Sequence, residues 1–72
     1  IDVKATGENI LRRRIEMGCT VLDVQRYLNL ACPQSVYHWQ AGRTLPNIDN
    51  FYALSVLLGT TVNDLVVERN CL

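Results

Sequence analysis

The 72-residue sequence predicts an all-helical fold, a bundle of five short helices. Three observations predict it. Apolar residues recur at the three- and four-residue spacing of an amphipathic helix. Residues that end helices, such as Gly18, Asn29 and Gly42, follow one another at intervals of about ten to fifteen residues. No segment of the sequence shows the alternation of apolar and polar residues that indicates a strand.

The length of the chain is typical of one small domain, and we expect a single domain over residues 1–72 with its core over residues 6–67. The hydrophobic content of 49% is sufficient for a modest core and is unlike that of a disordered segment. No apolar run approaches the roughly 20 residues that a membrane span requires. The first residues also lack the pattern of a signal peptide. We therefore expect no membrane partner.

The cysteines Cys19, Cys32 and Cys71 are odd in number and contain no C-x-x-C pair. This arrangement argues against a disulfide framework and favours a reducing, cytoplasmic setting. Together with His38 they match no zinc-binding spacing, so we expect no metal and no cofactor.

The first helix is predicted to begin at Thr6, whose hydroxyl suits an N-cap, with Glu8 in its first turn. Gly18 is expected to end it in the left-handed conformation. Its apolar stripe consists of Ile10, Leu11 and Ile15.

The second helix is predicted to begin after Thr20, which forms a capping-box pattern with Asp23. Asn29 is expected to end it, because asparagine tolerates positive φ better than most residues. Its apolar positions are Val21, Val24 and Leu28.

The third helix is predicted to run from Pro33 to Gly42, since proline suits the first position of a helix. At about 100° per residue, Val36 and Trp39 lie on its core face. The opposite side carries Gln34, His38 and Ala41, flanked by Ser35 and Tyr37. Amides, hydroxyls and an imidazole without carboxylates suit contact with bases and phosphates, but periodicity alone fits a solvated helix face equally well.

The fourth helix is predicted to be capped by Asn47 and closed by Gly59. Its buried face is Phe51, Leu54, Leu57 and Leu58. Thr61 and Asp64 form another N-cap pattern, which opens a short fifth helix through Leu65 and Val66.

The net charge is zero, but it is unevenly distributed. Residues 10–43 contain five arginines and two acidic residues, a net charge of +3. Residues 44–72 contain one arginine and three acidic residues, a net charge of −2. A positive middle fits one DNA-facing side and is also compatible with ordinary solvated surface.

The segment from Gly7 to Val66 resembles the Cro/repressor-type helix-turn-helix (XRE) family of transcriptional regulators. The order and spacing of nine positions carry the resemblance: Arg14, Gly18, Thr20, Trp39, Gly42, Pro46, Leu58, Gly59 and Thr61. In particular, PQSVYHWQAGRT looks like a repressor recognition helix that runs into a phosphate-contacting loop. The resemblance implies a repressor-like DNA-binding domain with a helix-turn-helix over about residues 20–42.

By this resemblance, the helix from Pro33 would lie in the major groove of double-stranded DNA. The residues that would contact base edges are Gln34, Ser35 and His38. The residues that would contact the DNA backbone are Thr20, Val21, Tyr37, Arg43, Thr44 and Arg14. Thr20 and Val21 would offer backbone N–H groups to a phosphate. Asn47 is better interpreted as a helix cap.

The sequence departs from the family pattern at several positions. Val21 stands where the family usually has a phosphate-binding Gln, Gln25 replaces a small Ala, and Asn29 replaces the turn Gly. The turn between the second and third helices is one residue longer than the commonest form. Gln40 replaces the Glu that often pairs with the Arg14 position. Glutamine can accept a hydrogen bond from the Arg14 guanidinium, but this bond lacks the added strength that a charged carboxylate gives. We therefore expect Arg14 to be freer to face a phosphate.

An enzyme is not expected, because the chain has one histidine, no Gly-rich phosphate loop and no spaced pair of carboxylates. The alternative to a DNA-binding regulator is a protein-interaction module of the same fold with little DNA affinity. Zero net charge and Val21 favour this alternative, whereas the polar face of the third helix and the positive middle of the chain oppose it. Repressor-type domains work as dimers, so a homodimer is a further expectation. Either a dimer edge or part of the core is formed by Leu65, Val66, Val67 and Leu72.

Overall fold

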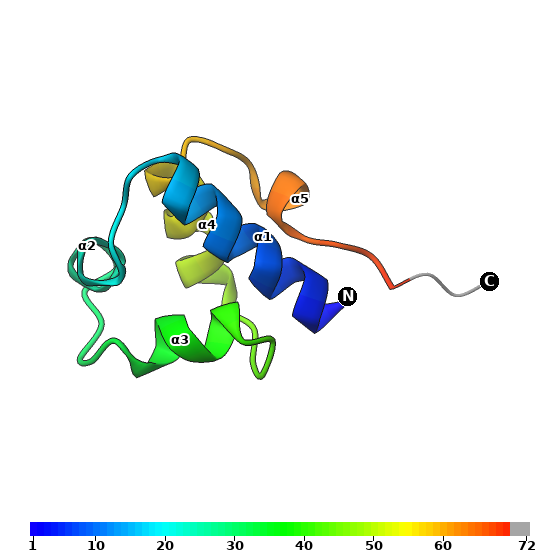
Figure 1. The fold of residues 1–72 in the computed structure, drawn as a ribbon, viewed down its shortest axis with the longest axis horizontal. Coiled ribbons are helices and arrows are strands. Elements are labelled where there is room, and N and C mark those ends of the chain that lie inside the picture. The colour runs from blue at the N-terminus through cyan, green and yellow to red at the C-terminus, as the bar shows by residue number, and fades with distance from the viewer. Residues whose placement is uncertain (70–72) are drawn as a thin grey trace.

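A computed structural model of the chain describes residues 1–69. These residues form five helices, and no strand occurs among them, so the predicted all-helical class is confirmed. The helices are α1 (Val3–Glu16), α2 (Val21–Tyr27), α3 (Gln34–Gln40), α4 (Ile48–Leu57) and α5 (Val62–Leu65). In Figure 1, α1 crosses in front of α4, while α2 and α3 form the other end of the molecule from the C-terminal segment. None of the helices in the described part of the chain is long and apolar enough to cross a membrane.

The first helix begins earlier than the sequence predicts. The carboxylate of Asp2 accepts a hydrogen bond from the N–H of Ala5 at 3.0 Å, and it is therefore the N-cap. Thr6 is fully buried inside α1, where its hydroxyl accepts a hydrogen bond from the N–H of Val67 at 3.0 Å. The predicted Thr6 cap is wrong because this hydroxyl is used to hold the C-terminal segment against α1. As a consequence, Glu8 lies beyond the first turn of α1.

The remaining predicted starts agree closely with the structure. The side chains of Thr20, Asn47 and Thr61 cap α2, α4 and α5, and Thr20 with Asp23 completes a capping box. Pro33 differs by one position, because it is the N-cap of α3 and not its first helical residue. The chain reverses after α2 at Asn29, which has a φ of 56° as expected from its tolerance of the left-handed region.

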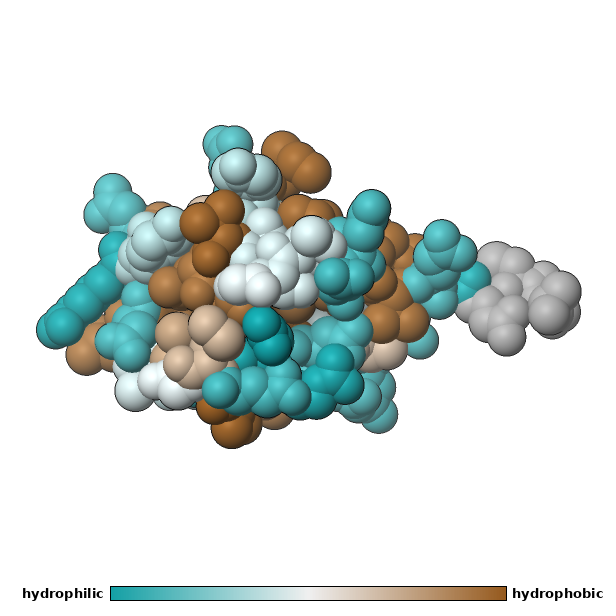
Figure 2. Space-filling view, turned by 90° about the horizontal axis from the view of Figure 1, so that it is seen from above, coloured by the Kyte–Doolittle hydropathy of each residue, from teal (hydrophilic) through white to brown (hydrophobic). Residues whose placement is uncertain are grey.

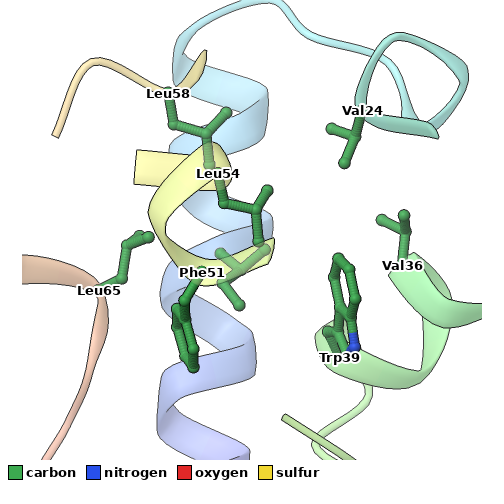
Figure 3. Packing of buried hydrophobic residues seen from close by; sticks show 8 residues of the cluster. Val24, Val36, Trp39, Phe51, Leu54, Leu58 and Leu65 are labelled. Atoms are coloured by element: carbon green, nitrogen blue, oxygen red, sulfur yellow. The ribbon is translucent and has the colours of Figure 1, made fainter. Parts of the chain in front are cut away.

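The core contains side chains from every helix (Figure 3). Its buried hydrophobic members are Ile10, Val24, Val36, Trp39, Phe51, Leu54, Leu58 and Leu65. Leu65 therefore completes the core and does not form a dimer edge. Leu72 lies outside the described residues. Ile15 is exposed, contrary to its predicted place in the apolar stripe. In this turn of α1, the guanidinium groups of Arg13 and Arg14 donate hydrogen bonds to Leu58 and Gln40. The side chain of Ile15 is therefore the one that faces solvent.

Close contact between α1 and α3 depends on Gly7. A Cβ atom at this position would overlap the carbonyl oxygen of Trp39 and would lie 3.2 Å from that of Gln40. The glycine thus lets the backbone of α1 touch the C-terminal end of α3. This contact and the burial of Trp39 set the position of α3 against the rest of the molecule.

Candidate nucleic-acid interface

The inner side of α3 is anchored in the core. Val36 is completely buried and Trp39 is 4% exposed. Figure 3 shows both side chains pointing from α3 toward Val24 of α2 and toward α4. The predicted core face of the third helix is confirmed, so the opposite face must be directed outward.

The outward face of α3 is polar. Gln34 and Tyr37 are exposed, and Ser35 and His38 are half-buried. Within residues 1–69, none of these polar side chains takes part in a hydrogen bond with the protein. Gln34 and His38 are one helical turn apart and therefore share a side of α3, with Ser35 adjacent. The three residues predicted to contact base edges are thus close together, and their donors and acceptors are available to a ligand.

The loop after α3 adds positive charge beside this face. Gly42, with a φ of 75°, reverses the chain, and the next two residues, Arg43 and Thr44, are exposed. A Cβ atom at Gly42 would lie 2.7 Å from the Cα atom of Lys4 and 3.1 Å from its Cβ atom. The backbone of the exposed Lys4 therefore lies next to this loop, in which Arg43 is also exposed. The sequence alone does not predict Lys4 as a site residue, because only the crossing of α1 and α3 brings it near this loop.

The N-terminus of α2 is already occupied by a carboxylate. Asp23 accepts a hydrogen bond from the N–H of Thr20 at 2.9 Å, and its own N–H donates to the Thr20 hydroxyl at 3.0 Å. The backbone hydrogen bond from Thr20 holds the pKa of Asp23 below its ordinary value of 3.8, and the side chain of Thr20 and the charge of Arg26 act in the same direction. The Thr20 N–H is thus not free for a phosphate, contrary to the expectation from the sequence.

Val21 occupies the first position of α2, and its half-buried side chain packs against the core. The N–H groups of the first helical residues have no acceptor within their own helix. Val21 can therefore still offer a backbone N–H at the surface. The nearby Asp23 carboxylate opposes the approach of an anion, so we expect this contact to be weak.

Two of the arginines in the positive middle of the sequence are used inside the fold. Arg14 donates from Nε to Oε1 of Gln40 at 2.7 Å and from Nη1 to the carbonyl oxygen of Cys19 at 2.8 Å. Gln40 thus does accept the expected hydrogen bond, but Arg14 is not left freer to face a phosphate. Arg13 donates from Nε to the carbonyl oxygen of Leu58 at 2.8 Å. The exposed arginines that remain in the segment are Arg12, Arg26 and Arg43.

The described part of the chain contains no pocket and no group of three metal-ligating residues. Cys19 is half-buried and Cys32 is exposed, while Cys71 lies outside the described residues. The candidate site is accordingly a convex helix face with a basic loop at its end. Comparison with protein-family models, with curated proteins and with solved structures found no match for this chain.

Proposed function

We propose that this chain binds double-stranded DNA in a sequence-specific way and acts as a repressor-like transcriptional regulator. In this proposal α2 and α3 form the helix-turn-helix, and α3 lies in the major groove. The observation that carries it is the outward face of α3. This face combines uncommitted amide, hydroxyl and imidazole groups with a complete absence of carboxylates, and it is held in place by Val36 and Trp39.

Base contacts are assigned by the chemistry of the side chains. Gln34 can donate to N7 and accept from N6 of an adenine in the bidentate arrangement that suits an amide. His38 can donate to O6 or N7 of a guanine. The short side chain of Ser35 can donate a hydrogen bond to a base, or accept one from it, where the helix lies closest to the bases. Tyr37 flanks them and is assigned to sugar and phosphate.

Backbone contacts are assigned to the exposed groups at the end of α3. Arg43 and Lys4 provide two cations on adjacent surface, and the hydroxyl of Thr44 provides a donor. Arg14 is assigned a structural role because its donors are engaged with Gln40 and Cys19. With about two or three phosphates neutralised, the logarithm of the association constant should fall against the logarithm of the salt concentration with a slope of roughly −2 to −3.

A second candidate is a protein-interaction module of the same fold. The engagement of Arg13 and Arg14 inside the molecule favours it, because these groups otherwise supply much of the positive charge. The Asp23 carboxylate at the start of α2 favours it as well. A mainly apolar protein contact would lack the steep salt dependence of DNA binding.

The test is selection from a random duplex pool, followed by salt titration on the selected sequence. Enrichment of a short motif, with binding at least tenfold weaker for Gln34→Ala or His38→Ala, supports the proposal. Asn63→Ala, an exposed change on α5, is the control and should bind as the unmodified chain does. If no motif is enriched and the chain binds any duplex in a salt-sensitive way, it binds the DNA backbone and α3 has no sequence preference. No binding at low salt would favour the protein-interaction module.

A further inference from the structure

The segment after α5 is hydrogen-bonded to the first turn of α1. The N–H of Val67 donates to the hydroxyl of Thr6 at 3.0 Å, and the carbonyl oxygen of Val67 accepts from the N–H of Asp2 at 2.7 Å. Thr6 is fully buried at this contact. Val66 and Val67, here called the strap, are therefore fixed beside the N-terminal end of α1 (Figure 1).

The strap lies where the chain leaves the body of the molecule. Leu65, directly before it, is buried in the core. Val66 and Val67 are half-buried, whereas Glu68 and Arg69 are exposed. Figure 2 shows the same change from hydrophobic to hydrophilic surface toward the C-terminal end. Terminal segments open at a lower free energy than the core does, so we expect the strap to come away from α1 without unfolding of the core.

The turn of α1 that the strap contacts also touches the loop after α3. A Cβ atom at Gly42 would lie 2.7 Å from the Cα atom of Lys4, so the two backbones are in close contact. At about 100° per residue, Lys4 lies on roughly the opposite side of α1 from Asp2 and Thr6. The first turn of α1 is thus packed between the strap and Gly42. A shift of this turn is transmitted to Gly42, because a backbone cannot rotate out of contact as a flexible side chain can.

We propose that the strap positions the loop at residues 42–44 for contact with the DNA backbone, and that release of the strap lowers DNA affinity. The inference rests on the proposed function for the role of Arg43 and Thr44 in that contact. The base-reading side of α3 is held in a different way, through the burial of Val36 and Trp39 in the core. Release of the strap should therefore weaken binding without changing the preferred DNA sequence.

Val67→Pro releases the strap without a substitution in α1 or in the loop. Proline has no N–H, so the hydrogen bond to Thr6 is lost. Val66 has a φ of −77° and a ψ of 133°, which suits the residue before a proline. We expect the amide signals of Gly42 and Arg43 to shift in NMR spectra recorded without DNA. On the selected duplex we expect affinity to fall about three- to tenfold, as when one or two phosphate contacts weaken, with the same motif selected.

Val67→Ala is the matched control, because alanine keeps the N–H that donates to Thr6. It should leave the loop signals and the DNA affinity as they are in the unmodified chain. A second pair of variants changes the acceptor of the same hydrogen bond. Thr6→Val removes the hydroxyl and should reproduce the Val67→Pro result, whereas Thr6→Ser keeps it and should not. Circular dichroism checks that each variant is folded.

Loop signals that stay in place in Val67→Pro would overturn the coupling between the strap and the loop. So would shifts of equal size in Val67→Ala, or shifts spread over α2 and α4, which would indicate general loosening of the fold. Shifted loop signals with unchanged affinity for the selected duplex would overturn the effect on DNA binding. If the unmodified chain binds no duplex at all, the proposed function fails, and the spectra without DNA still decide the coupling.

Discussion

Gly7 illustrates how one missing side chain sets the position of the candidate site. By helix propensity alone, alanine would stabilise α1 at this position by about 1 kcal/mol. The backbone of α3, however, occupies the space that a Cβ atom needs. A carbonyl oxygen of a packed helix cannot rotate away as a flexible side chain can. Packing therefore outweighs propensity here.

We predict that Gly7→Ala lowers the free energy of unfolding by about 1–3 kcal/mol, because α1 and α3 must move apart. Urea denaturation measures the change. Glu8→Ala, an exposed neighbour in the same helix, is the control and should change stability by less than about 0.5 kcal/mol. If Gly7→Ala instead stabilises the chain, the close crossing of the two helices is incorrect.

Arg14 and Arg12 are two residues apart in α1 but differ in their surroundings. Arg14 donates to Gln40 and to the Cys19 carbonyl, whereas Arg12 is exposed. We predict that Arg14→Ala costs about 1–2 kcal/mol of stability, because two acceptors lose a charged donor. Arg12→Ala should cost almost nothing. Urea denaturation and DNA titration of both variants check this. A loss of DNA affinity in Arg14→Ala with unchanged stability would return Arg14 to the phosphate contacts.

Asp23 makes the free energy of unfolding of the chain depend on pH in the acid range. Its pKa is lower in the folded chain than its ordinary value of 3.8, because the Thr20 N–H stabilises the carboxylate. The folded state therefore binds fewer protons than the unfolded state. The associated stability is fully present above about pH 5 and is lost as the pH falls through 3.8 and below.

We therefore predict that Asp23→Asn is less stable than the unmodified chain at pH 6 and that this difference narrows at pH 3. Urea denaturation at the two pH values measures both differences. A difference that stays constant with pH would mean that the capping-box carboxylate is not held in its charged form.

At the scale of elements, α3 depends on Trp39 for its place in the fold. The indole packs among side chains of other helices (Figure 3), and only 4% of the residue is exposed. We predict that Trp39→Ala lowers the free energy of unfolding by about 3–5 kcal/mol, as for other large aromatic truncations in a core. Thermal and urea unfolding measure this loss. A cost well under 1 kcal/mol would mean that the buried face of α3 is wrongly assigned.

Local signals in the sequence predicted most element boundaries, and long-range contacts account for the errors. Capping by Thr20, Asn47 and Thr61 involves residues only three positions apart, so it is visible in the sequence. The hydroxyl of Thr6 suits a cap equally well. Its actual partner is the N–H of Val67, at the other end of the chain, and no local pattern reveals that pairing.

For the candidate site, too, the local features can be predicted from the sequence and the long-range contacts cannot. The outward face of α3 follows from helical periodicity once Val36 and Trp39 are taken as the core face, and the structure bears this out. Lys4 reaches the site only through the crossing of α1 over Gly42, which periodicity cannot predict. Arg14 belongs to the positively charged segment of the sequence, but in the fold its guanidinium donates a hydrogen bond to Gln40.

At the scale of the whole molecule, the surface differs in character between α3 and α4. Polar residues and cations gather around α3 and the loop after it, whereas exposed apolar side chains on α4 include Ile48, Tyr52 and Val56. The residues that we propose for DNA contact thus lie on surface that is polar and positively charged.

Methylation interference on the selected duplex shows whether α3 binds in the major groove, as we propose. Dimethyl sulfate methylates N7 of guanine in the major groove and N3 of adenine in the minor groove. We predict that N7 methylation within the motif blocks binding and that adenine N3 methylation there does not. His38→Ala should remove the interference at one guanine. Interference confined to adenine N3 would contradict the placement of α3 in the major groove.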